Sequence, residues 1–412
     1  MKLYYKILSM IFAVALVACT PEATPDPVDP APDGGTENVP DTDPEPEEEF
    51  ASEEAKGEFI ILAWSDIIDA YDSKWKLEKM VEAQFDTYLG WFNTAEEVEA
   101  LLTAADETGM KIITSHPGLQ SDTENAIKAM ATHQSLYGYH IMDEPQVSDF
   151  PSLAERVNAI REFDKERPCY INLFPNYAGG WEGENNLKNI RLFLETVPMS
   201  LLSFDNYPVL ADGSERIIRP DWYANLEDIR TAALEAGLPI WAFALALSHG
   251  SYPIPTIGEL RLQQFSNMLY GAVSFQYFTT WGFIQNHGVT GVYNIVQQMN
   301  SELRAWQRFF YGADIKGIWH TGSVIPVGAQ ALTTLPTGVK KLETEESGAL
   351  VTYFTNHGKN YLAVQNKKCN WGMDLVVEFD DPKAKMLSMD GTLSPIEEKY
   401  RIPAGDIRVF RW

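Results

Sequence analysis

Short apolar runs alternate eight times with amphipathic helical patterns, and this alternation limits the possible folds more than any other feature of the sequence. It begins at Glu58 and continues to about residue 313. Parallel strands need a long crossover between them, and a helix of this kind supplies one. Eight such units close a barrel, so we predict a (β/α)8 barrel over residues 58–313. The predicted strands are Phe59–Trp64, Thr87–Phe92, Lys111–Ser115, Tyr137–Met142, Cys169–Phe174, Leu201–Phe204, Ile240–Ala246 and Val273–Thr279.

Local end signals support the predicted helices. A Ser or Thr followed three residues later by Glu is typical of a helix start, because each residue can then cap the other's backbone N–H. Glycines are typical of helix ends, where the left-handed conformation is needed. Capping pairs occur at Thr94 with Glu97, Ser121 with Glu124 and Thr256 with Glu259, and the glycines expected to end helices are Gly109 and Gly237.

The pattern changes after the barrel. Residues 314–412 contain short segments of alternating polarity, such as Leu350–Phe354 and Tyr361–Gln365, separated by Gly, Asn and Asp turns. Such spacing predicts an antiparallel β-sandwich. The predicted fold class is therefore α/β, a (β/α)8 barrel followed by a small sandwich domain.

The first 19 residues have the pattern of a targeting segment. Two lysines precede the apolar run Ile7–Ala18, and Leu16-Val17-Ala18-Cys19 closes it. This ending resembles the lipobox of bacterial lipoproteins, in which the cysteine is lipidated. The resemblance implies a lipid anchor on Cys19 and a place in the bacterial outer membrane, on its periplasmic or cell-surface face.

A tether is expected to follow. Residues 20–57 hold eight prolines, thirteen acidic residues and one lysine, with almost no large apolar side chain. Such a segment cannot bury enough surface to offset the entropy of ordering, so we predict a disordered acidic linker. The net charge of the whole chain is −26, which excludes nucleic acid as an expected partner because phosphates would repel it. We expect a monomer.

Polar and aromatic side chains follow the predicted strands. The carboxyl ends of barrel strands share one face, where reacting groups collect. Asp143 and Glu144 follow the fourth strand directly. Carboxylates and amides pair with hydroxyls, and flat aromatic rings cover the apolar face of a sugar, so this rim predicts a carbohydrate site. The candidate substrate-binding residues are Trp64, Asp66, Trp91, His116, Asn176, Tyr207, His249, Gln276 and Trp281.

We expect no cofactor and no metal. His116, His140 and His249 come from different strands and lack the close spacing of metal ligands. Cys169 and Cys369 lie in separate predicted domains without a metal or redox spacing, which predicts isolated buried thiols.

Three segments together resemble a known family. They are Tyr139–Pro145 (YHIMDEP), Phe204–Pro208 (FDNYP) and Gln276–Trp281 (QYFTTW). They are similar to the barrel glycoside hydrolases of Bacteroidetes polysaccharide-use systems, and the similarity covers the barrel and the sandwich. In the large clan of retaining barrel enzymes, the glutamate of Asn-Glu-Pro after strand four is the acid/base. The resemblance implies that role for Glu144, with Asp143 replacing the asparagine that grips a sugar hydroxyl.

One departure from this clan leaves the mechanism open. The clan places its nucleophile after strand seven, but residues 239–249 contain no carboxylate. Asp205, after strand six, is the remaining candidate for a base or nucleophile, and a capping or hydroxyl-binding role in its Asp-Asn-Tyr-Pro turn is equally consistent.

A second arrangement uses the adjacent acids themselves. Some hexosaminidases with a similar layout use the first acid to orient a substrate acetamido group and the second as the acid. Neighbouring residues of a regular strand point to opposite sides, so Asp143 is expected to turn away unless the strand has ended at Met142.

The sequence thus predicts a glycoside hydrolase with Glu144 as general acid and Asp205 or Asp143 as its partner. Burial and the charge of Asp143 are expected to raise the pKa of Glu144. The alternative is a lipoprotein that binds glycans on a barrel that has lost catalysis.

Overall fold

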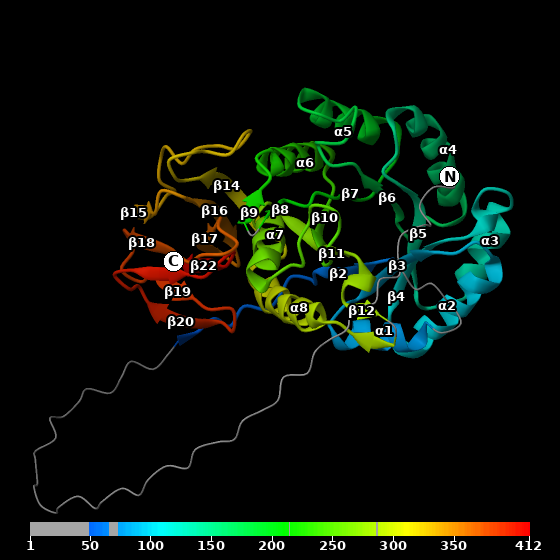
Figure 1. Ribbon diagram of the computed structural model, residues 1–412, viewed down its shortest axis with the longest axis horizontal. Helices are drawn as coiled ribbons and strands as arrows, with labels where there is room; N and C mark the ends of the chain where they lie inside the picture. Colours follow the sequence, from blue (N-terminus) through cyan, green and yellow to red (C-terminus); the bar gives the residue numbers. More distant parts are fainter. Residues whose placement is uncertain (1–48, 66–72, 214, 286) are drawn as a thin grey trace, which may run out of the picture. The chain divides into compact units, whose positions relative to one another are not determined.

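The computed structural model describes residues 49–65, 73–213, 215–285 and 287–412. Eight parallel strands close into a barrel in the order β10-β11-β2-β3-β4-β5-β6-β7, which confirms the predicted barrel (Figure 1). Every predicted strand is present, and each end lies within one residue of its predicted position. The barrel strands are β2 Ile60–Trp64, β3 Thr87–Trp91, β4 Lys111–Ser115, β5 Leu136–Asp143, β6 Cys169–Leu173, β7 Leu202–Phe204, β10 Ile240–Leu245 and β11 Ala272–Phe278.

Helices cover the outside of the barrel. Buried apolar residues on their inner faces, such as Leu101 of α2 and Phe193 of α5, pack against the strands in one large core. Two short hairpins, β8 Val209–Asp212 with β9 Glu215–Ile218 and β12 Ile284–Gln285 with β13 Gly288–Val289, follow β7 and β11. The helices are α1 Lys74–Glu82, α2 Ala95–Thr108, α3 Thr123–Met130, α4 Phe150–Phe163, α5 Glu184–Thr196, α6 Trp222–Ala236, α7 Ile257–Leu269 and α8 Gly291–Phe310.

Most of the predicted helix ends are confirmed. Both bonds of the capping box are present at Thr94 and at Thr256, and Gly109 and Gly237 end their helices in the left-handed conformation. The box predicted at Ser121 is wrong. The backbone N–H of Ser121 donates to the carbonyl of Gly118 in a turn. Helix α3 therefore begins at Thr123, two residues after Ser121.

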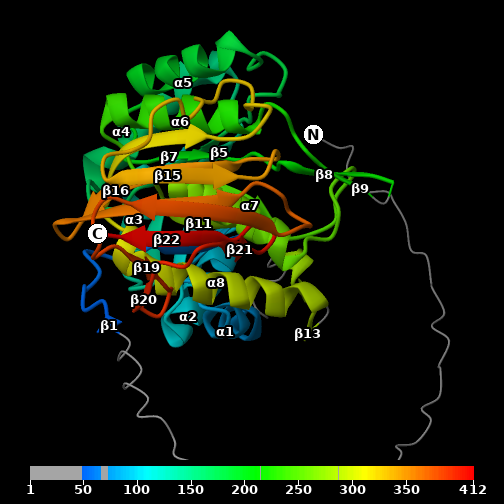
Figure 2. The same cartoon turned by 90° about the vertical axis from the view of Figure 1, so that its left-hand side faces the viewer.

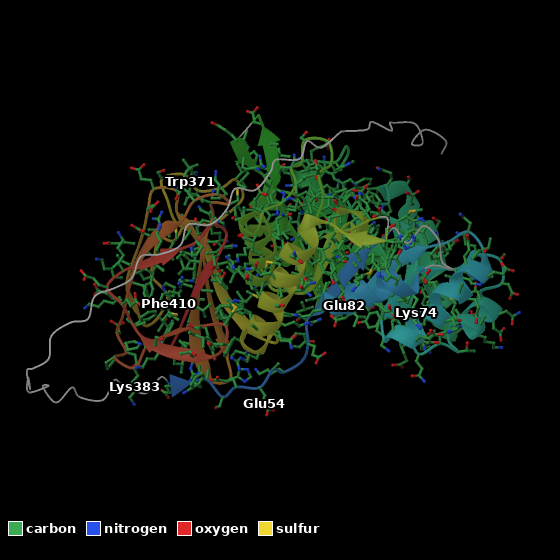
Figure 3. All side chains as sticks on the ribbon, turned by 60° about the horizontal axis from the view of Figure 1, so that its bottom comes forward. Glu54, Lys74, Glu82, Trp371, Lys383 and Phe410 are labelled. Atoms are coloured by element: carbon green, nitrogen blue, oxygen red, sulfur yellow. The ribbon has the colours of Figure 1, made fainter. Side chains whose placement is uncertain are left out.

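The carboxyl-terminal residues form two antiparallel sheets with an apolar core between them, which confirms the predicted sandwich. Figure 3 shows Phe410 of this core and Trp371, whose side chain is 68% exposed. The larger sheet has the order β1-β20-β19-β22-β17-β16-β14, and the smaller has the order β15-β18-β21. Their strands are β1 Glu49–Phe50, β14 Asp314–His320, β15 Val339–Thr344, β16 Ala349–Asn356, β17 Lys359–Asn366, β18 Met373–Phe379, β19 Lys385–Leu387, β20 Thr392–Pro395, β21 Tyr400–Ile402 and β22 Ile407–Arg411.

The sandwich packs on helix α7 of the barrel. The Ser266 hydroxyl of α7 donates to Gln365 Oε1 of β17 at 2.6 Å, and both side chains are buried. Figure 2 shows the antiparallel strands in front of this helix. A buried hydrogen bond therefore joins the two parts.

The predicted linker is wrong at its carboxyl end. Residues 49 and 50 form β1, which pairs with β20, and Ala51 is buried. The Arg411 guanidinium also pairs with the Glu53 carboxylate at 2.6 Å. The edge of β20 supplies hydrogen-bond partners for the backbone of β1. The composition of the linker does not reveal that such an edge is present. Residues 20–48 of the predicted linker and the signal segment with Cys19 lie outside the described residues. No helix among the described residues has the length and apolar character needed to cross a membrane.

Candidate active site

A cavity of about 340 Å³ lies at the carboxyl ends of the barrel strands. It brings together the three predicted acids, Asp143, Glu144 and Asp205. It also contains three of the predicted sugar-binding residues, Trp64, Tyr207 and His249. The other lining residues are Asn172, Phe174, Pro175, Tyr177, Ala178, Phe243, Tyr252 and Phe278. The cavity is therefore acidic at its centre and aromatic at its walls.

A bulge in β5 directs Asp143 into this cavity. The pairing of β5 with β6 shifts by one residue between His140 and Met142, so that Asp143 lies opposite Asn172. Its Oδ1 accepts a hydrogen bond from Asn172 Nδ2 at 3.3 Å. A bulge adds a residue and thereby reverses the side on which later side chains point. The expectation that Asp143 turns away from the cleft is thus wrong, although β5 does continue past Met142.

Glu144 reaches the same cavity through its backbone conformation. Its φ is +48°, in the left-handed region, and its N–H donates to the carbonyl of Asn172 at 2.9 Å. A residue other than glycine rarely adopts this conformation, which costs on the order of 1 kcal/mol or more and is often found at functional sites. Two adjacent carboxyls therefore line one cavity.

Asp205 completes a cluster of three carboxyls. It follows β7, its side chain is only 6% exposed, and its Oδ1 accepts from Asn172 Nδ2 at 2.9 Å. It also forms a side-chain hydrogen bond with Glu144. Asp205 therefore interacts with Glu144 within the same cavity.

The cluster holds protons more tightly than ordinary carboxyls. Burial, and then the charge of Asp143, raise the pKa of Glu144 to about 7, against a hydrogen bond from Asp205 that lowers it, which confirms the predicted direction. Part of Asp143 is exposed in the cleft. Its carboxyl is nevertheless largely surrounded by protein, and this burial raises its pKa to about 6. Burial and the charges of Glu144 and Asp143 raise the pKa of Asp205 as well. Near neutral pH the cluster is therefore partly protonated.

Two tyrosines and an arginine support one wall. The hydroxyls of Tyr177 and Tyr252 lie 3.1 Å apart, which links the loops after β6 and β10. Arg219 Nη2 donates to the Tyr252 hydroxyl at 3.2 Å, and its Cζ lies 3.8 Å from the centre of the Tyr177 ring. These side chains are held in place by one another, so this wall is preorganised.

Several lining residues were not among the predicted site residues, although the sequence contains a signal for some of them. Phe243 lies in a predicted strand at an inward position, as its contact with Trp64 inside the barrel shows. Asn172 also occupies an inward position of its strand, where a polar residue is unusual. Tyr252 lies in a long loop and had no such signal.

The remaining predicted site residues lie elsewhere. Trp91 is 45% exposed and stacks on His140 beside Trp64, and Trp281 is exposed near Phe278, so both lie at the rim. Asp66 lies outside the described residues. Three other predicted residues do not line the cavity and form hydrogen bonds within the protein. Those three are His116, whose Nδ1 accepts from Gly118 N; Asn176, which bonds to Asn225 and Asp221; and Gln276, inside the barrel below the cavity.

The described residues contain no group of three His, Cys, Asp or Glu side chains placed to hold a metal ion. Cys169 and Cys369 are buried free thiols, and burial raises their pKa values to about 12 and about 11. Burial lowers the pKa of His140 to about 4, so this imidazole is neutral. These groups do not take part in the carboxyl cluster.

No protein-family model matches this sequence, and no curated protein is similar to it. Solved structures with a similar chain path include glycoside hydrolases. A family 30 subfamily 8 xylanase from Clostridium acetobutylicum aligns with 87% of this chain and 97% of its own, at 11% identity and a TM-score of 0.43.

The alignment with a family 39 glycoside hydrolase from Bacteroides cellulosilyticus WH2 covers 85% of this chain and 80% of that enzyme's chain, at 10% identity and a TM-score of 0.48. A family 51 α-L-arabinofuranosidase from Bifidobacterium longum covers 88% and 97%, at 9% identity and a TM-score of 0.46. Likenesses this low transfer neither residues nor substrate.

Proposed function

We propose that this chain is a glycoside hydrolase acting on a polysaccharide or oligosaccharide in the cavity at the barrel mouth. The observation that carries the proposal is the meeting of three carboxyls with raised pKa values inside an aromatic-walled cavity. Glycoside hydrolysis needs an acid that protonates the leaving oxygen and a second group that stabilises the developing positive charge. Aromatic walls suit the apolar face of a sugar ring.

Glu144 is the proposed general acid. A pKa of about 7 keeps a large fraction of this carboxyl protonated at neutral pH while leaving it acidic enough to give up the proton. A carboxyl with the ordinary pKa would be almost fully ionised there and could not donate.

Asp143 is the proposed partner. Two flanking carboxyls lie about 5–5.5 Å apart in retaining enzymes and about 6.5–9.5 Å apart in inverting ones. Asp205 is buried, accepts a hydrogen bond from Asn172 and interacts with Glu144. Asp143 instead lies beside Glu144, is held by Asn172 and keeps an exposed surface toward the cleft. This arrangement supports a mechanism in which Asp143 orients a substrate acetamido group that attacks the anomeric carbon.

The test is a screen of the protein lacking residues 1–47 on plant and host glycans, with the first-formed anomer identified by proton NMR. We expect cleavage of N-acetylated substrates only, with retained configuration. Inverted products from a substrate without an acetamido group would instead assign the base to Asp205. Retention with such a substrate would contradict both mechanisms.

A second candidate function is glycan binding without hydrolysis. The interaction between Glu144 and Asp205 favours it, because a carboxyl engaged with another acid is not free to protonate a scissile linkage. The end of β10 also brings Phe243, His249 and Tyr252 to the cavity, and none of them is a carboxyl. Tight glycan binding that is unaffected by Glu144→Gln, without turnover by either protein, would establish this function.

We also propose that Cys19 carries a lipid anchor and that the protein resides in the outer membrane. The motif Leu16-Val17-Ala18-Cys19 after an apolar run supports this proposal. Cys19→Ser should move the protein from the membrane fraction to the soluble fraction. Persistence in the membrane fraction would contradict lipid anchoring.

A further inference from the structure

The interior of the barrel contains an unusual group of polar side chains directly below the carboxyl cluster. A barrel of this kind is normally filled by branched apolar residues. Here β6, β7 and β11 place four polar side chains in that space, each no more than 3% exposed. Burying polar groups is costly unless all of them are bonded, so their placement needs a reason. The four residues are Tyr170, Asn172, Ser203 and Gln276.

Their hydrogen bonds run in one direction. The Tyr170 hydroxyl donates to Gln276 Oε1 at 2.6 Å, and Gln276 Nε2 donates to Ser203 Oγ at 2.9 Å. The Ser203 hydroxyl in turn donates to Asn172 Oδ1 at 2.9 Å. Ser203 and Tyr170 have one hydroxyl proton each, so once these are donated to Asn172 and Gln276, Ser203 accepts from Gln276 Nε2 and no proton remains for the contact between the Ser203 and Tyr170 oxygens at 2.8 Å. We call this chain the barrel relay.

The barrel relay ends at the cluster. Asn172 Nδ2 lies 2.9 Å from Asp205 Oδ1 and 3.3 Å from Asp143 Oδ1, so its two hydrogens can serve one carboxyl each. A reversed amide would place Oδ1 against both carboxylates and would repel them. The orientation of one amide therefore decides whether the two aspartates meet a donor or an acceptor.

We infer that the barrel relay is a positioning device, which fixes the Asn172 amide so that Asp143 and Asp205 both face its N–H donors, which favours their ionised forms relative to a reversed amide. This inference rests on the proposed function, in which Asp143 is the partner of Glu144. Tyr170, Ser203 and Gln276 act through Asn172, because none of these three lines the cavity. The titratable and charged groups that face the two aspartates are Glu144, Tyr170, Tyr177 and Tyr207, with Arg219 behind Tyr177.

The test is Ser203→Ala, with Ser274→Ala as the matched control. Ser274 is equally buried, lies two residues before Gln276 on β11 and so faces the same side, and its hydroxyl has no hydrogen-bond partner within the described residues. Carbon-13 NMR of Asp- and Glu-labelled protein would follow the carboxyl titrations directly. We expect Ser203→Ala to raise the midpoint of the aspartate titration by about one pH unit, since a charge-assisted bond is weakened, while Ser274→Ala leaves it unchanged.

Tyr170→Phe is a second variant, which removes one hydroxyl and keeps the ring in place. It should move the same midpoint in the same direction by a smaller amount, and it serves if Ser203→Ala fails to fold. On a cleaved substrate, both variants should shift the acidic limb of the kcat profile upward and leave KM unchanged, because the substituted side chains do not reach the cavity.

Unchanged titrations in both folded variants would overturn the inference, and so would a loss of activity without a shift in any carboxyl titration. The titration does not depend on turnover. A shift in a protein that cleaves no glycan would support the barrel relay and count against the proposed hydrolase function.

Discussion

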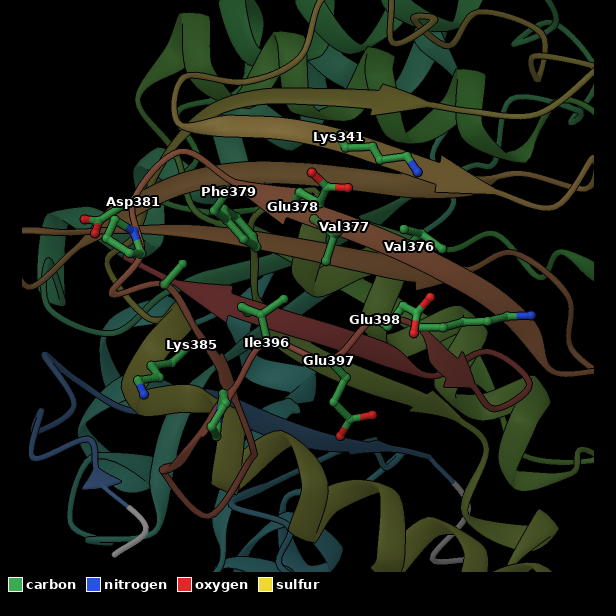
Figure 4. Close-up of a pocket in the computed structure, with 14 residues that line it drawn as sticks. Lys341, Val376, Val377, Glu378, Phe379, Asp381, Lys385, Ile396, Glu397 and Glu398 are labelled. Carbon is green, nitrogen blue, oxygen red and sulfur yellow. The ribbon is translucent and has the colours of Figure 1, made fainter. Parts of the chain in front are cut away.

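Two of the cavities that are lined by carboxylates differ in size, in exposure and in the balance of their charges. The groove on the sandwich is the larger, at about 740 Å³, and the cavity at the barrel mouth measures about 340 Å³. Figure 4 shows the sandwich groove, where charged residues such as Lys341, Glu378 and Glu397 surround the apolar Phe379 and Ile396. Acids and lysines alternate around it.

The comparison shows that solvation, more than size, decides what a carboxylate can do. In the groove, Glu378 forms an ion pair with Lys340, and both side chains are about half exposed, so water screens the charges. At the barrel mouth no lysine or arginine lines the cavity among the described residues, and burial raises the pKa values of all three acids. A carboxyl that holds its proton near pH 7 can act as an acid, whereas a screened surface carboxyl cannot.

The largest expected difference between the two cavities concerns turnover. Glu144→Gln should lower kcat by about two to four orders of magnitude, the usual contribution of a general acid, while glycan binding measured by calorimetry stays nearly the same. Glu397→Gln in the groove is the control and should leave kcat unchanged. Equal rates for the Glu144 variant and the unsubstituted protein would remove Glu144 from the mechanism.

The next effect distinguishes the acids within the barrel cavity. Asp143→Ala should lower kcat about a hundredfold or more if Asp143 orients the substrate, whereas Asp205→Ala should act mainly on binding. Steady-state kinetics on an N-acetylated substrate would measure both. If Asp205→Ala is nearly inactive and azide restores its activity, Asp205 is the base and Asp143 has the lesser role.

The pH dependence of stability offers a smaller but direct comparison. The pKa of Glu144 is about 7 in the folded state and 4.5 ordinarily, so the folded protein binds this proton more tightly than the unfolded chain does. The resulting stabilisation is complete below about pH 4.5 and is lost as the pH rises through about 7. Glu144→Gln should therefore raise the free energy of unfolding by roughly 2 kcal/mol more at pH 8 than at pH 4.

Denaturant unfolding of the variant and of the unsubstituted protein at the two pH values would measure this difference. A Glu144→Gln effect of the same size at both pH values would mean that the proton is held no more tightly in the folded state, and the contrast between the cavities would fail.

The smallest expected effect lies in the groove itself. Lys341→Gln removes a charge that is paired with Glu343 at 3.1 Å on the surface. Such pairs contribute about 0–1 kcal/mol, so the melting temperature should change by no more than a few degrees and glycan cleavage by nothing measurable. A clear loss of glycan binding in this variant would show that the groove is also a carbohydrate site.

Several features of this protein could be read from the sequence because they depend on neighbours along the chain. The apolar runs placed all eight barrel strands, and the pairs at Thr94 and Thr256 fixed two helix starts, since capping is a bond within one turn. The position of Glu144 after a buried strand placed it at the barrel mouth. The raised pKa of Glu144 also followed from burial and an adjacent acid.

Other features were decided only when the strands met. The bulge that turns Asp143 inward exists in the pairing of β5 with β6, and the bond between Asp205 and Glu144 joins the ends of β5 and β7. The barrel relay likewise joins side chains up to 106 positions apart. Strand residues 49 and 50 found their partner more than 300 positions away, at β20. The sequence determines which residues form strands and helices, because periodicity and capping are local. Register, bulges and contacts between carboxyls depend on how the barrel closes, and that required the tertiary structure.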